Sequence, residues 1–304
     1  MNTIKNLPIE ISSIVFSLGL LGSSFSTSNK NTSFFCTLLG FLLLIGLSIR
    51  IFSNLRDFYI EVDNPFKLSM FITYPLSIMI LSMPLNNLNP YIGFGVWLVG
   101  FLLYLGLVIV FSLKYARKFS INNVGTSWFV AYVGFVIVSI TCPIYTSKLI
   151  SLSLWMGFLL AIVISPIVFK SLRKNRFMMR RHDIAVLAFP LSIILLGFSY
   201  VYQDGLYIIN NILILCSQAV YLYVLFTLLR ILLMKRDFDF DITSITFPLL
   251  ITGISLRVQV GIWSILDQNI YPFDKIANAE IIFATLVLVY VGIKSLVRII
   301  KNDY

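Results

Sequence analysis

Charged side chains are scarce in this sequence: they make up 12% of its 304 residues, against about 25% in soluble proteins. Hydrophobic residues make up 59%, and the mean hydropathy is +0.93. A single water-soluble core cannot bury that much apolar surface, because soluble domains stop growing at about 250–300 residues. The composition therefore excludes a soluble globular protein and predicts an all-α protein that crosses a membrane several times.

Histidine and cysteine are also rare, with one histidine (His182) and three cysteines (Cys36, Cys142 and Cys216). The cysteines lie far apart inside apolar runs, without the C-x-x-C spacing of a metal or redox site, and we interpret them as small buried hydrophobic residues. The apolar runs contain no His/Asp/Glu cluster and no Ser-His-Asp set, so we expect neither an enzyme nor a bound metal or cofactor. The first apolar run lacks an A-x-A-like cleavage site, so we expect no signal peptide.

Apolar runs between charged or Asn-, Pro- and Gly-rich breaks predict ten transmembrane helices in one domain that covers residues 1–304. They lie at about 9–26, 34–53, 69–86, 91–113, 127–145, 149–169, 184–202, 207–233, 242–266 and 276–299. An even number of spans places both termini on one side of the bilayer.

The net charge of +10 would suggest a nucleic-acid partner in a soluble protein, but here it reports orientation. Nineteen Lys and Arg residues fall on the face that holds the termini, and three fall on the opposite face. We therefore expect a multi-pass protein of the cell (plasma or inner) membrane with both termini in the cytoplasm. The basic run 170–181 is either a solvated cytoplasmic loop or a site for anionic lipid or a partner.

An aromatic residue recurs at spacings of 58, 58, 57 and 58, at Phe16, Tyr74, Tyr132, Phe189 and Phe247. Each unit contains two spans, so successive units enter the membrane in the same direction. The sequence predicts five quasi-symmetric helical hairpins around a central pore, at about 9–53, 69–113, 127–169, 184–233 and 242–299.

The odd-numbered spans carry about twice as many Ser and Thr residues as the even-numbered spans, Thr243 among them. They also contain Pro75, Pro190 and Pro248, each directly after a repeat aromatic, where a proline removes a backbone hydrogen bond and bends the helix. Because lipid tolerates polar groups poorly, we expect the odd-numbered spans to form the inner ring.

Three motifs connect the chain to a known family. They are Pro8-Ile9 leading into Phe16-Ser17-Leu18-Gly19-Leu20, Asn64-Pro65-Phe66-Lys67, and Thr246-Phe247-Pro248-Leu249. With ten spans in about 300 residues, the chain resembles the tellurite-resistance/dicarboxylate transporter family, which includes TehA-type bacterial proteins and plant slow anion channels. The resemblance covers nearly the whole chain. It departs from the family pattern at Glu10, at Arg257, and at Asn64-Pro65 in place of His-Pro.

The resemblance implies a homotrimer with an anion pore through each subunit, and Phe247 as the side chain that plugs the pore. We therefore expect a channel for small anions in the lipid bilayer, gated by Phe247. The alternative is a proton-coupled dicarboxylate or oxyanion carrier on the same fold, with Glu10 as a candidate proton site. Phe16, Tyr74, Tyr132 and Phe189 either complete an aromatic collar at the gate or pack against neighbouring helices.

Arg257 is the only basic residue deep within a span, and an intramembrane charge is a functional candidate by default. It either attracts anions at the outer mouth or pairs with Glu280 or Asp267. Glu10 either acts at the cytoplasmic mouth or caps the first helix. Asp237-x-Asp239-x-Asp241 lacks the glycine and terminal glutamate of a calcium loop, so we interpret it, like His182, as part of a solvated loop.

Overall fold

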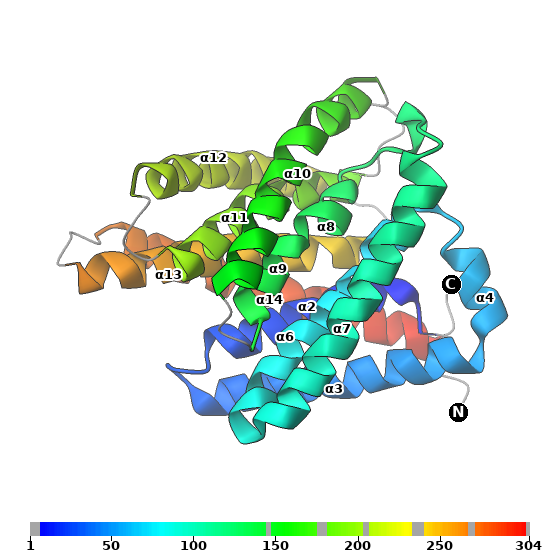
Figure 1. The fold of residues 1–304 in the computed structure, drawn as a ribbon, viewed down its shortest axis with the longest axis horizontal. Coiled ribbons are helices and arrows are strands. Elements are labelled where there is room, and N and C mark those ends of the chain that lie inside the picture. Colours follow the sequence, from blue (N-terminus) through cyan, green and yellow to red (C-terminus); the bar gives the residue numbers. More distant parts are fainter. Residues whose placement is uncertain are drawn as a thin grey trace.

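The protein is described by a computed structural model that covers residues 7–143, 147–174, 181–202, 207–232, 240–266 and 271–301. Within these ranges every regular element is helical (Figure 1). The elements are η1 (Ile9–Ile11), α2 (Ser12–Ser24), α3 (Lys30–Ser53), α4 (Leu55–Glu61), α5 (Pro65–Phe71), α6 (Thr73–Leu88), α7 (Pro90–Phe111), η2 (Ser112–Ala116), η3 (Ile121–Asn123), α8 (Trp128–Val133), α9 (Phe135–Thr141), α10 (Ser147–Lys174), η4 (Arg181–Leu187), α11 (Ala188–Val201), α12 (Tyr207–Leu232), η5 (Phe240–Ile245), α13 (Thr246–Ile265) and α14 (Phe273–Lys301).

Eight helical stretches in the described ranges are long and apolar enough to cross a membrane. They are Lys30–Ser53, Pro65–Leu88, Pro90–Ala116, Lys148–Lys174, Ile184–Val201, Ile208–Leu229, Phe240–Ile265 and Phe273–Lys301. The expected class, an all-α multi-pass membrane protein, is confirmed. Two of the ten expected spans correspond to shorter apolar stretches, Ile9–Ser24 and Trp128–Thr141, which fall below the usual length of about 20 residues.

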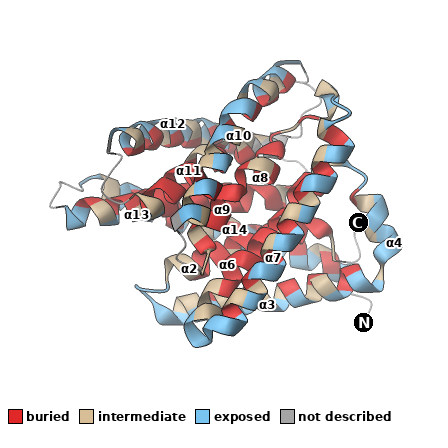
Figure 2. Ribbon diagram, viewed as in Figure 1, coloured by how far each residue is buried: buried red, intermediate tan, exposed pale blue. Residues whose placement is uncertain are grey.

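The helices divide into a buried set and an exposed set, which we call the inner helices (α2, α6, α9, α11 and α13) and the outer helices (α3, α7, α10, α12 and α14). In the most apolar 18 residues of each long inner stretch 72–78% are buried, against 28–33% in those of the outer stretches. Figure 2 shows the same contrast, with blue faces on α3, α7, α10 and α12 and red along the centre. This burial agrees with the expectation that the odd-numbered segments lie inside.

The inner helices contact one another in a closed ring. α2 packs against α6, α6 against α9, α9 against α11, α11 against α13, and α13 against α2 again. Each outer helix packs against the inner helix that precedes it in the chain, so that the five outer helices surround the ring. Apolar outer side chains such as Leu102, Ile162 and Phe226 are more than half exposed, as side chains in contact with lipid would be.

Every inner segment is interrupted near its repeat aromatic. A short helix or 3-10 turn comes first (η1, α5, α8, η4 or η5), and the longer inner helix follows it directly or after one residue. Pro75, Pro190 and Pro248 are each the third residue of their inner helix. A proline is tolerated there, because the first backbone N–H groups of a helix have no partner within the helix.

The outer helix α7 begins with an Asn-Pro step, and so does the short helix α5. The Asn64 side chain accepts hydrogen bonds from the backbone N–H groups of Phe66 and Lys67, and Pro65 is the first residue of α5. Asn89 caps α7 in the same way ahead of Pro90. Asparagine at the cap and proline in the first turn are both favoured at helix starts, so the Asn64-Pro65 motif has a local structural cause.

Candidate functional site

Three of the five repeat aromatics pack together between neighbouring inner helices. Phe16, Phe189 and Phe247 are fully buried, and they come from α2, α11 and α13. The ring centroid of Phe247 lies 5.6 Å from that of Phe16 and 5.4 Å from that of Phe189, with interplanar angles of 66° and 77°. Edge-to-face packing of this kind fills the space between these three helices with hydrocarbon.

Tyr74 and Tyr132 do not join this phenylalanine cluster. The Tyr74 hydroxyl forms a 2.7 Å hydrogen bond with Ser48 of α3, and the Tyr132 hydroxyl forms a 3.0 Å hydrogen bond with Ser112 of η2. Both side chains therefore tie an inner segment to an outer one, which corresponds to the packing alternative. A buried phenol needs a hydrogen-bond partner and phenylalanine does not, which is consistent with the different contacts of the two residue types.

Several inner hydroxyls bond to neighbouring inner segments, although most of their hydrogen bonds go to carbonyls of their own helix. Ser17 donates to Thr246 at 2.7 Å, and Ser69 donates to Ser127 at 2.6 Å. Thr243, which the sequence places in the expected inner ring as a candidate for lining the pore, is 1% exposed and donates to the backbone carbonyl of Glu10 at 2.8 Å. The high Ser and Thr content of these helices thus contributes contacts between helices.

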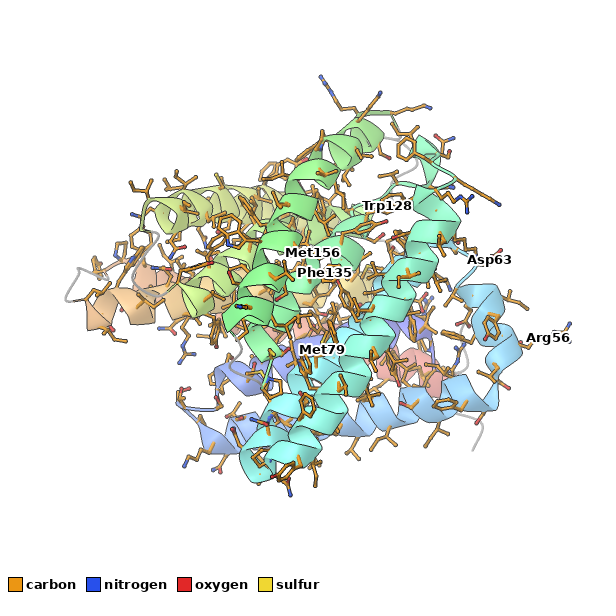
Figure 3. All side chains as sticks on the ribbon, in the orientation of Figure 1. Arg56, Asp63, Met79, Trp128, Phe135 and Met156 are labelled. Atoms are coloured by element: carbon orange, nitrogen blue, oxygen red, sulfur yellow. The ribbon has the colours of Figure 1, made fainter. Side chains whose placement is uncertain are left out.

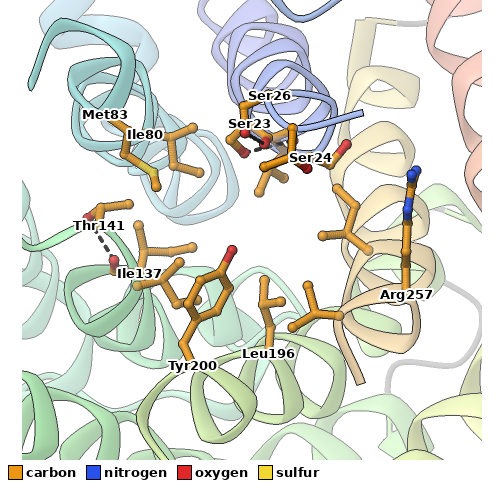
Figure 4. Close-up of a pocket in the computed structure, with 15 residues that line it drawn as sticks. Ser23, Ser24, Ser26, Ile80, Met83, Ile137, Thr141, Leu196, Tyr200 and Arg257 are labelled. Atoms are coloured by element: carbon orange, nitrogen blue, oxygen red, sulfur yellow. Dashed lines mark hydrogen bonds between the residues drawn. The ribbon is translucent and has the colours of Figure 1, made fainter. Parts of the chain in front are cut away.

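The inner ring contains a pocket toward the carboxyl ends of its helices. The phenylalanine cluster lies between this pocket and the short helices that begin the inner segments. The volume of the pocket is about 250 Å³, and all five inner helices contribute to its wall (Figure 4). It is lined by Leu20, Ser23, Ser24, Ser26, Thr27, Ile80, Met83, Ile137, Ile140, Thr141, Leu196, Tyr200, Ile254, Arg257 and Val258. We call it the outer pocket.

The outer pocket follows the sequence repeat. Ser26, Met83, Thr141, Tyr200 and Arg257 line it, and each lies nine to eleven residues after the repeat aromatic of its own unit. At 1.5 Å per helical residue this places them about 15 Å along the axis from the aromatic level. The repeat could therefore have located the pocket, although we did not infer it from the sequence.

Arg257 is the only charged residue among the described residues that line the outer pocket. It is half-buried, and its guanidinium lies 5.4 Å from the ring centroid of Phe25, the residue that follows α2. Within the described chain it forms no ion pair: Glu280 is 6% exposed and accepts a 3.4 Å hydrogen bond from Gln218 instead. Asp267, the other partner we considered, lies outside the described residues.

At the opposite end of the inner ring, Glu10 pairs with Lys67. The Glu10 carboxylate is 6% exposed and lies 3.0 Å from the Lys67 ammonium of α5. Glu10 belongs to the short 3-10 turn η1, which packs against α5 and η5. The pair therefore links the first segment of the chain to the second.

The acidic and basic loop motifs lie mostly outside the described residues. This applies to Asp237, Asp239 and residues 175–180 of the basic run, whereas Asp241 is 3% exposed in η5. Among the described residues no three His, Cys, Asp or Glu side chains lie close enough to hold a metal ion. Cys36 is buried, Cys142 is half-buried and Cys216 is exposed.

Comparison with models of known protein families and with curated protein sequences finds no match to this chain.

Proposed function

We propose that the protein is an anion channel in which each chain conducts small anions through the ring of inner helices, with Phe247 as its gate. The proposal rests on the closed ring of inner helices, which holds the outer pocket toward the carboxyl ends of these helices and the phenylalanine cluster nearer their starts. Phe247 is fully buried between Phe16 and Phe189, and one cation, Arg257, lies in the pocket above. The sequence resemblance to TehA-type proteins and slow anion channels supports the same assignment.

In this proposal the three rings close the pathway by filling it and by excluding water from it. An ion cannot cross a narrow hydrocarbon constriction without losing its hydration shell, which is how hydrophobic gates block conduction. Rotation of the Phe247 ring away from Phe16 and Phe189 would open the axis. Attraction of anions would come from Arg257 and from the +10 net charge of the chain.

The proposal also includes the finer architecture. Ten crossings in five hairpins require α2 and α8–α9 to span a locally thinned bilayer or to tilt little, because both are short. The closed ring of contacts among α2, α6, α9, α11 and α13 supports this arrangement. The resemblance further implies a homotrimer in the cell membrane with cytoplasmic termini.

The decisive variant is Phe247→Ala, measured by recording anion currents from purified protein in planar bilayers. We expect the current to rise by about tenfold or more, which corresponds to lowering the barrier by about 1.4 kcal/mol. The matched control is Phe198→Ala on α11, because Phe198 is also fully buried but packs against Trp155 and Phe158 of the outer helix α10. An unchanged current in a folded Phe247→Ala protein would contradict the gate.

The alternative, a proton-coupled carrier, is favoured by one observation. Glu280 is a carboxylate within a spanning helix, 6% exposed and without a cationic partner among the described residues. Buried acidic groups of this kind serve as proton sites in transporters. Reversal potentials distinguish the two functions. The reversal potential of a channel follows the anion gradient alone, whereas that of a coupled carrier also shifts with the proton gradient. In a carrier that uses Glu280, the Glu280→Gln variant would lose the proton-dependent shift.

A further inference from the structure

The outer pocket combines a single positive charge with a mainly apolar wall. Eight of its fifteen lining residues are aliphatic or Met: Leu20, Ile80, Met83, Ile137, Ile140, Leu196, Ile254 and Val258. Six others carry hydroxyl groups, and the remaining one is Arg257. Figure 4 shows the apolar side chains of Ile80, Ile137 and Leu196 around the hollow, with Arg257 at one side.

The guanidinium of Arg257 is oriented by a ring contact, and its N–H groups form no hydrogen bond with a described residue. Its guanidinium lies over the Phe25 ring, a cation–π contact that orients a planar cation. Neither Arg257 nor Tyr200 forms a side-chain hydrogen bond with any described residue, and the Tyr200 hydroxyl points into the hollow in Figure 4. By contrast, Ser23 and Ser24 already donate to the carbonyls of Leu20 and Leu21.

The backbone around the pocket disfavours a second negative charge. α2 ends at Ser24, α9 at Thr141 and α11 at Val201, so three helix carboxyl ends lie at the pocket wall. The carboxyl end of a helix carries partial negative charge on its unpaired carbonyl groups. One guanidinium can balance one anionic group here, and a dianion would leave a carboxylate beside these carbonyls and against hydrocarbon.

We propose that the outer pocket is a binding site for monovalent organic anions, namely a carboxylate attached to a short hydrocarbon body. The carboxylate binds the guanidinium of Arg257, with the Tyr200 hydroxyl as a second donor, and the hydrocarbon lies against Leu196, Ile254 and their neighbours. The volume of about 250 Å³ equals that of roughly eight water molecules at about 30 Å³ each, which suits a carboxylate of four to six carbons. A dicarboxylate does not fit, because the pocket offers one positive group for its two negative charges.

This inference deepens the channel proposal, since the pocket lies on the proposed pathway, but binding is measurable without transport. The experiment titrates purified protein with butyrate and with succinate and follows binding by ligand-observed NMR. We expect butyrate to bind the wild type more tightly than succinate does. Arg257→Gln should weaken butyrate binding by about tenfold or more, because a charge-assisted hydrogen bond to the ligand is lost.

Three further variants keep the test valid even if the Arg257→Gln protein does not fold. Ile140→Trp fills the pocket from α9 and should abolish butyrate binding, whereas Ile109→Trp, on the lipid-facing side of α7, should leave it unchanged. Arg56→Gln, at an exposed position of α4, is the matched control for loss of one positive charge.

The outcomes separate this inference from the channel proposal. The binding site is overturned if the wild type does not bind butyrate, or if it binds succinate as tightly. It is also overturned if both Arg257→Gln and Ile140→Trp keep the wild-type affinity for butyrate. The channel proposal stands or falls on the Phe247→Ala current with chloride. The binding site is supported if butyrate binds wild type, Arg56→Gln and Ile109→Trp but not Ile140→Trp.

Discussion

Several hydroxyl side chains of the inner helices hydrogen-bond to a neighbouring helix as well as to a carbonyl of their own helix. Thr252 donates to the carbonyl of Pro248 on its own helix and forms a 2.9 Å hydrogen bond with Ser192 on α11. Ser199 of α11 likewise donates to Gln259 of α13 at 2.9 Å. Inside a bilayer these groups have no water to bond to, so pairing with each other satisfies them. A hydroxyl engaged in this way is not a free donor for a permeating ion.

Removing one such hydroxyl should loosen the ring measurably. We expect Thr252→Val to lower the free energy of unfolding by about 1 kcal/mol, the size of an interhelical hydrogen bond in membrane proteins. The measurement is the thermal unfolding midpoint in detergent. Thr227→Val is the control, because the exposed Thr227 of α12 donates only to the Tyr223 carbonyl of its own helix. Equal midpoints for the two variants would show that the Ser192–Thr252 bond contributes no stability.

At the scale of the helix, glycine decides how closely neighbouring elements approach. A Cβ atom at Gly253 of α13 would lie 2.9 Å from Ile281 Cγ1 and 3.0 Å from the backbone nitrogen of Ile281 on α14. A Cβ atom at Gly197 of α11 would likewise lie 2.5 Å from a Val136 methyl group of α9. Small residues at such contacts allow helix backbones to approach closely. In a bilayer no hydrophobic driving force brings helices together, so close van der Waals packing contributes to their association.

The α13–α14 contact provides a matched pair of substitutions on one helix. Gly253→Ala should destabilise the protein by about 1–3 kcal/mol, because the backbone of α14 must move to admit the methyl group. Gly261→Ala should be neutral or stabilising by up to about 1 kcal/mol, since a Cβ atom there meets nothing within 4 Å and alanine favours helix. Chemical unfolding in mixed micelles measures both. A Gly253→Ala protein as stable as Gly261→Ala would refute the close packing.

At the scale of the whole molecule, the two ends of the described chain lie together. Ile11 of η1 and Ile299 of α14 belong to one apolar cluster with Phe240, and Figure 1 marks N and C on the same side. The connection between α2 and α3 lies at the opposite end, where Ser26 and Thr27 line the outer pocket. Figure 3 shows Arg56 and Asp63 near the edge that also carries N and C in Figure 1.

Charge asymmetry predicts which end faces the cytoplasm, and it is tested with single cysteines in a background without the three native ones. We expect Ser28→Cys, in the exposed connection after α2, to react with a membrane-impermeant maleimide on intact cells. Arg117→Cys, at an exposed position after η2, should react only after the cells are permeabilised. Labelling of both positions, or of Arg117→Cys alone, on intact cells would contradict either the orientation or the crossing of α2.

Much of the architecture could be predicted from local patterns. The apolar runs located the helices, because a span needs about 20 residues without charge whatever surrounds it. The Ser, Thr and Pro content separated inner from outer segments, since polar groups avoid lipid. The 57–58-residue spacing also applies to the pocket, whose residues recur nine to eleven positions after each aromatic.

The sequence by itself determined the membrane class, the helical segments and the positions at which an aromatic recurs in each of them. Only the tertiary structure decided that Phe16, Phe189 and Phe247 converge while Tyr74 and Tyr132 turn outward. It also decided that Arg257 faces a pocket and lies over Phe25. The physical reason is that a repeat sets the height of a side chain along its helix, whereas its direction depends on the helix rotation and on the partners that its neighbours offer.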